Sequence, residues 1–159
     1  MTASGKRVLA VAVRTKRIAC VVFEDGIPVT WDAVGKKHKT PERAAEKLRS
    51  WIDEHKPDVL VSENPDTATR KGKRQIAVLK AFQAVGEELP LIHFIVERKR
   101  RFDNVYVEAA AFGEQFPDLA GLVPRPIKPW ESEGHNVVCF EALALARDAG
   151  VIADTKSGS

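Results

Sequence analysis

The stretch Pro57-Asp58-Val59-Leu60-Val61-Ser62-Glu63 decides the fold. Its centre, Val59-Leu60-Val61, has no polar residue in alternation, which predicts a strand buried on both faces, as in parallel sheets. The helix before it starts at Thr40, a capping hydroxyl followed by proline, and ends at Pro57. A second helix follows the basic segment Arg70–Arg74. A buried strand between two helices indicates an α/β fold.

Three β-rich segments precede this strand, and one more strand follows it. They span Val8–Val13, Ile18–Phe23, Ile27–Val34 and Leu91–Val96. Asp25-Gly26 lies between the second and third segments and is a hairpin signal. Two more helical patterns, Phe102–Phe116 and Gly134–Ala149, flank a proline-rich loop at Leu122–Trp130. The order predicts a mixed five-stranded sheet, an antiparallel meander and then parallel strands, with helices on both faces.

Length and composition fit one globular domain. The chain has 159 residues, 44% of them hydrophobic and 30% charged, with a net charge of +3. We expect a single domain over residues 1–153 and a flexible tail over 154–159. No apolar run reaches the ~20 residues of a membrane span, and the N-terminus lacks a secretory signal. Cys20 and Cys139 lie in apolar runs, so we expect buried free thiols and a cytoplasmic protein.

The basic residues are concentrated in three runs, which hold nearly half of the 25. The runs are Lys36, Lys37 and Lys39; Arg70, Lys71, Lys73 and Arg74; and Arg98, Lys99, Arg100 and Arg101. Such clusters bind phosphates by releasing counterions, if folding brings them together. The alternative is three solvated loops that share no face.

Acidic residues mark a second candidate site. Glu63 and Asp66 follow the buried strand, at the edge where α/β folds bind ligands. Glu141 lies on the apolar stripe of the last helix, where an unpaired carboxylate is unfavourable. Glu133 and His135 come just before that helix. Carboxylates suit Mg²⁺ or Mn²⁺. The alternatives are a polar strand-to-helix loop for Glu63 and a solvent-facing rim position for Glu141.

Several motifs in this order resemble the ribonuclease H-like superfamily, and within it the RuvC-type Holliday junction resolvases. The stretch 57–63 resembles the family strand that ends in a metal-binding Glu. Phe140–Ala146 resembles its last-helix motif Asp-Ala-Leu-Ala-x-Ala, in which the Asp is a metal ligand. Glu88–Ile92 resembles the start of its fifth strand, and Lys128–Glu133 a segment of uncharacterised relatives. The resemblance covers Val8 to Gly150 and implies the same fold.

The chain departs from the family at the metal ligands. The family's first strand carries a catalytic Asp, and Ala12 stands at that position. Val138 stands where resolvases have a second Asp or His, and Glu141 is one methylene longer than the family's Asp. Unless an acid such as Asp32 substitutes, the resemblance implies a nuclease site that is lost or weakened.

Three functions remain open at this point. The first is a RuvC-like protein with a degenerate nuclease site that binds branched or structured DNA, or RNA, through the second and third basic runs. The second is an active endonuclease in which Glu63 and Glu141 hold Mg²⁺ or Mn²⁺, assisted by Asp66, Glu133 or His135. The third is a non-catalytic scaffold or regulatory protein; the resemblance implies a homodimer, since resolvases of this family pair through helices. Phe102, Tyr106 and Trp130 are candidates for stacking on unpaired bases, with core packing as the alternative for the first two.

Overall fold

Five strands form one sheet in the order β3-β2-β1-β4-β5. The computed structural model describes residues 6–38, 40–131 and 133–152; the expected tail at 154–159 lies outside them, as does Lys39. The strands are β1 (Arg7–Arg14), β2 (Arg17–Glu24), β3 (Ile27–Val34), β4 (Val59–Glu63) and β5 (Ile92–Val96). The helices are α1 (Pro41–His55), α2 (Lys73–Glu88), α3 (Val105–Gln115) and α4 (Val137–Asp148), with short 3-10 helices η1 (Lys36–His38) and η2 (Pro117–Leu122).

The first three strands form the expected antiparallel meander, and β4 and β5 then add in parallel. β1 pairs antiparallel with β2 and parallel with β4. The β2–β3 connection is the two residues Asp25 and Gly26, with φ of 54° and 77°. Both values are positive, as a tight hairpin turn of the primed type requires, and this explains the Asp-Gly pair. The mixed five-stranded sheet predicted from the sequence is confirmed.

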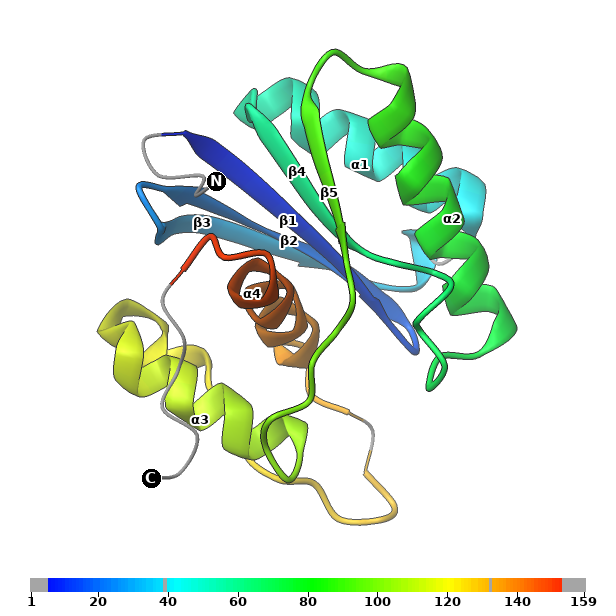
Figure 1. Ribbon diagram of the computed structural model, residues 1–159. Helices are drawn as coiled ribbons and strands as arrows, with labels where there is room; N and C mark the ends of the chain where they lie inside the picture. The colour runs from blue at the N-terminus through cyan, green and yellow to red at the C-terminus, as the bar shows by residue number, and fades with distance from the viewer. Residues whose placement is uncertain (1–5, 39, 132, 153–159) are drawn as a thin grey trace.

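Helices cover both faces of the sheet (Figure 1). α1 and α2 pack together on one face, α4 crosses the other, and α3 packs on the outer side of α4. Thr40 caps α1, where its hydroxyl accepts a hydrogen bond from the backbone N–H of Arg43 at 3.2 Å. The helix ends at Lys56, which is left-handed with φ 48° and precedes Pro57.

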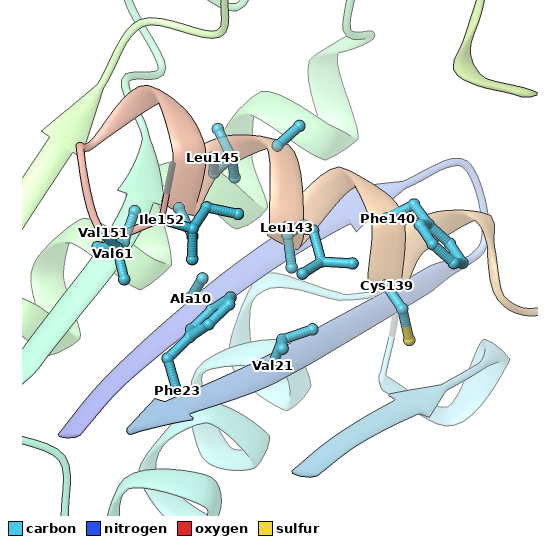
Figure 2. Packing of buried hydrophobic residues seen from close by; sticks show 14 of the residues in the cluster. Ala10, Val21, Phe23, Val61, Cys139, Phe140, Leu143, Leu145, Val151 and Ile152 are labelled. Carbon is cyan, nitrogen blue, oxygen red and sulfur yellow. The ribbon is translucent and has the colours of Figure 1, made fainter. Parts of the chain in front are cut away.

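Alternation along β1 sorts its side chains into two cores. Leu9, Val11 and Val13 join the core under α1 and α2. Ala10 and Ala12 face the opposite way and belong to the core under α4. Figure 2 shows Ala10 in this core. α4 is buried on nearly all sides because it lies between the sheet and α3. A polar side chain on α4 therefore has to find its partners inside the protein.

Some element boundaries differ from the prediction. α3 begins at Val105 rather than Phe102, because the Asn104 side chain caps it by accepting hydrogen bonds from the N–H groups of Tyr106 and Val107. α4 begins at Val137, and the 3-10 helix at Pro117–Leu122 was not predicted. Both cysteines are buried and free, as expected. Among the described residues, no helix is both long and apolar enough to cross a membrane.

Candidate functional site

Glu63 and Glu141 lie together beneath the carboxyl end of β4. Glu63 is the last residue of β4 and shares the α4-facing side with Val61. Glu141 lies in α4, and each residue is only 2% exposed. The Lys71 ammonium lies between them, 3.5 Å from Glu63 Oε1 and 3.2 Å from Glu141 Oε2. The two carboxylates that the sequence predicted as a pair are thus joined by a buried lysine.

Two guanidinium groups also reach Glu141. Arg14 Nη1 and Arg98 Nε each lie 3.4 Å from Glu141 Oε1. Arg14, the last residue of β1, also forms a two-bond pair with Glu133, its Nε and Nη2 donating at 2.8 and 2.6 Å. Three cations from three separate segments therefore converge on the single carboxylate of Glu141.

A second layer of ion pairs holds Arg98 in place. Its guanidinium donates to both carboxylate oxygens of Glu108, a buried residue of α3. Arg147 Nη1 lies 2.8 Å from Glu108 Oε2, and Arg147 Nη2 lies 3.2 Å from Asp148 Oδ1. Lys71, Arg98 and Arg147 have side chains no more than 6% exposed. A buried charge is unfavourable unless it has a partner of opposite charge. The network therefore supplies each of these buried cations with a carboxylate.

The two carboxylates have opposite pKa shifts. Burial alone would raise the pKa of Glu141, but the charges of Lys71, Arg98 and Arg14 outweigh it and lower the pKa to about 2. Burial raises the pKa of Glu63; the charge of Lys71 opposes the rise and the charge of Glu141 adds to it, and the net shift of the pKa is upward. Glu63 Oε1 has no hydrogen-bond partner among the described residues. Glu141 is therefore a fixed anion, whereas Glu63 is the less satisfied of the pair.

These residues do not fit the Mg²⁺ or Mn²⁺ that the resemblance implies. Divalent ions of this kind take several oxygen ligands, whereas Glu141 already faces three protein cations. Ala12, at the position of the family's catalytic Asp, contributes only a methyl group to the core under α4. Over the described ranges, no group of three or more His, Cys, Asp or Glu could hold a metal ion.

Of the other predicted residues, Glu133 is linked to this pair through Arg14, whereas Asp66 and His135 have other partners. Asp66 is exposed in a turn where its N–H donates to Asn64 Oδ1. His135 Nδ1 lies 2.8 Å from Arg17 Nη1. Asp32 accepts a hydrogen bond from Trp51 Nε1 at 3.0 Å, toward α1 on the opposite face of the sheet. Asp32 is thus not placed to substitute for the missing Asp.

The second and third basic runs meet in a cleft at this end of the molecule. Three adjoining hollows, of about 420, 250 and 240 Å³, all have Arg70 and Arg100 in their walls. We call their union the basic cleft. Its other basic residues are Arg14, Lys71, Arg98, Lys99 and Arg101. Lys73 is exposed at the start of α2, and Arg74 donates to the carbonyl of Thr15. Lys37, from the first run, is not among the residues that line these hollows.

Sequence reasoning missed four members of the ion-pair network: Arg14, Glu108, Arg147 and Asp148. Arg14 follows Ala12 by two residues in a strand, so both side chains point to the same face. Asp148 follows Glu141 by seven residues and Arg147 interrupts an apolar helix, so helical spacing carried a signal. The sequence carried no such signal for Glu108, because the burial of this residue depends on how α3 packs against α4.

The fold is similar to that of RuvC from Thermus thermophilus. One solved structure, T. thermophilus RuvC in complex with a Holliday junction substrate, has a TM-score of 0.53 and 13% identity, covering 88% of this chain and 90% of that one. A second Thermus thermophilus RuvC structure has a TM-score of 0.50 and 14% identity, with the same coverage. No protein-family model matches the chain, and no curated protein sequence does. The chain therefore has the ribonuclease H-like fold seen in RuvC.

Proposed function

We propose that this protein is a divergent RuvC-like protein that binds branched or structured DNA in the basic cleft, with a degenerate nuclease site. The observation that carries the proposal is the meeting of two basic runs in one cleft. Arg70–Arg74 and Arg98–Arg101 follow different strands, yet residues of both line the same hollows. Clustered cations on one surface are the electrostatic footprint of a nucleic-acid site.

The rim of the cleft offers charges that a ligand can use. Arg70, Lys99 and Arg100 are exposed, so they can contact phosphates without giving up a buried carboxylate partner. A similar fold has been solved with a Holliday junction substrate, which makes branched DNA the first ligand to test. The proposal favours DNA, and a junction of the same sequence made of RNA is the comparison that tests this choice.

The centre below the cleft supports a structural role for its carboxylates. Lys71 lies between Glu63 and Glu141, where its ammonium neutralises them without a metal ion. Arg98 and Arg14 complete the neutralisation of Glu141. We therefore infer that the protein binds DNA without a divalent ion and does not cleave it.

Binding is tested with a labelled four-way junction and a linear duplex, titrated at several salt concentrations. We expect the logarithm of the affinity to fall linearly with the logarithm of salt concentration. The double variant Arg70→Ala/Arg100→Ala should reduce the magnitude of that slope by about 2. The control variant Lys37→Ala/Lys80→Ala removes the same charge from exposed positions outside the cleft-lining set. Equal binding by both variants would contradict the proposal.

The inactive centre is tested by adding Mg²⁺ or Mn²⁺ to the protein with the junction. We expect junction binding in EDTA to equal binding with the ions, and no strand cleavage in either. Cleavage that depends on metal and disappears in Glu63→Gln would overturn the degenerate site in favour of an active endonuclease. The binding experiment would still stand on its own in that case.

A further inference from the structure

Trp130 is the most exposed of the large hydrophobic residues that the structure describes. Its exposed fraction is 78%, whereas Trp51 is buried and Trp31 packs against the core under α4. It lies in the segment between η2 and α4, where Pro124, Pro126 and Pro129 restrict the backbone. The core does not use this side chain, so its exposure needs another explanation.

The segment around Trp130 is held by its own contacts. Glu131 Oε1 accepts a hydrogen bond from the backbone N–H of Lys128 at 2.9 Å, and Glu131 Oε2 lies 3.5 Å from Arg125 Nη2. The Lys128 ammonium lies 5.4 Å from the centroid of the Trp130 ring. One cation covers one face of an indole, which leaves the other face for a second planar group.

The segment is also fastened to the basic cleft. Glu133 forms the two-bond pair with Arg14, and Arg14 is part of the cleft wall. Trp130 is three residues before Glu133, so their Cα atoms are at most about 10 Å apart. In Figure 1 this yellow-orange segment lies at the lower end of the molecule, together with the segment that follows β5. A strand whose phosphates occupy the cleft is thus within reach of the indole.

We propose that Trp130 stacks on an unpaired base of the nucleic acid whose phosphates lie in the basic cleft. The inference rests on the proposed function and adds a class of ligand to it: DNA with single-stranded or unstacked bases beside a duplex. Lys128 lies beside the indole, and its positive charge favours a polyanion over an apolar protein partner. Phe102 is less suited, because it is half-buried and the Arg147 guanidinium lies 6.0 Å from its ring centroid.

Two labelled probes separate stacking from phosphate binding: a blunt duplex, and the same duplex with a single-stranded thymidine overhang. We expect Trp130→Ala to weaken binding of the overhang probe about tenfold and to leave binding of the blunt duplex unchanged. Trp130→Phe should retain an intermediate affinity, because phenylalanine stacks less strongly than indole. In the wild type, tryptophan fluorescence should be quenched by the overhang, and the quenching should disappear in Trp130→Phe, which keeps Trp31 and Trp51.

The variant Arg70→Ala/Arg100→Ala separates a failure of the stacking inference from a failure of the proposed function. It should weaken binding of both probes. If it does so while Trp130→Ala binds the overhang like the wild type, the stacking inference is wrong and the proposed function stands. If the wild type binds neither probe nor the junction, both are wrong. Because Trp130 is exposed, its variants should unfold at the temperature of the wild type, which checks that a loss of binding is local.

Discussion

The buried centre and the rim of the cleft both contain lysine and arginine, but these side chains have different roles in the two regions. At the centre, the side chains of Lys71 and Arg98 are 6% and 3% exposed, and both face the carboxylate of Glu141. At the rim, Arg70 and Arg100 are exposed. Both pairs come from the same two runs of basic sequence. Within each run, neighbouring residues are therefore divided between neutralising the interior and charging the surface.

This division shows why a count of basic residues overstates the charge available to a ligand. A buried cation surrounded by carboxylates cannot leave them for a phosphate without leaving an unpaired buried charge behind. An exposed cation can neutralise a phosphate and release the counterions condensed on the nucleic acid, without leaving a buried carboxylate unpaired. Removing a central residue should therefore affect folding first, and removing a rim residue should affect binding alone. Four variants, three of them with a matched control variant, test this difference.

The largest effect is expected for Arg98→Met. The substitution keeps the aliphatic stem and removes the charge that faces Glu108 and Glu141. Breaking a buried ion pair on one side destabilises a protein by about 3–5 kcal/mol, since the remaining charges lose their partner. Urea unfolding of the wild type and of Arg98→Met measures the difference in their free energies of unfolding.

Arg100→Met is the matched control for this variant. It makes the same chemical change two residues away, at an exposed position. We expect its free energy of unfolding to be within about 0.5 kcal/mol of the wild type. Equal losses for Arg98 and Arg100 would mean that burial does not separate the two regions.

The second effect is a loss of stability in acid that depends on Glu141. Its pKa is about 2 in the folded protein, against an ordinary value of 4.5. A lowered folded-state pKa stabilises the protein above pH 4.5, and this stabilisation is lost as the pH falls toward 2. The shift corresponds to about 3 kcal/mol. The wild type should therefore lose its advantage in unfolding free energy over Glu141→Gln as the pH falls from 4.5 toward 2.

Glu88→Gln is the control for the acid experiment. Glu88 is 55% exposed and paired with Arg49 at 3.1 Å on the surface. Because exposed pairs contribute little, the difference between this variant and the wild type should change hardly at all with pH. Parallel curves for Glu141→Gln and the wild type would show that the three cations do not hold its charge.

Glu63→Gln should have a smaller effect, of opposite sign. Burial raises the pKa of Glu63, so the stability it contributes is fully present below pH 4.5 and is lost as the pH rises through its folded-state pKa. Glutamine does not ionise, so the variant does not lose stability as the pH rises, and Lys71 still has Glu141 as a partner. We expect the variant to be more stable than the wild type at pH 7, by less than the Glu141 effect, and equal to it in acid. A destabilised variant at pH 7 would contradict the predicted sign.

Local sequence patterns predicted the fold but not the composition of the centre. The Asp25-Gly26 turn, the Thr40 cap and the apolar stretch at 59–61 each act within a few residues, so the element order could be read from them. Lys71 was assigned to a surface run because no local pattern distinguishes it from Arg70. Its burial depends on its contact with Glu141, which is 70 residues away in the sequence, and such long-range contacts leave no local trace.

The smallest effect on stability, and a clear one on binding, is expected for Arg100→Ala. The residue lines all three hollows of the basic cleft and is exposed, so its removal should change the free energy of unfolding by less than about 0.5 kcal/mol. The slope of log affinity against log salt for the junction should decrease in magnitude by about 1. Lys80→Ala, at an exposed position of α2, should leave the slope unchanged. If the Arg100 variant unfolds more easily but binds like the wild type, then the rim serves the fold just as the centre does.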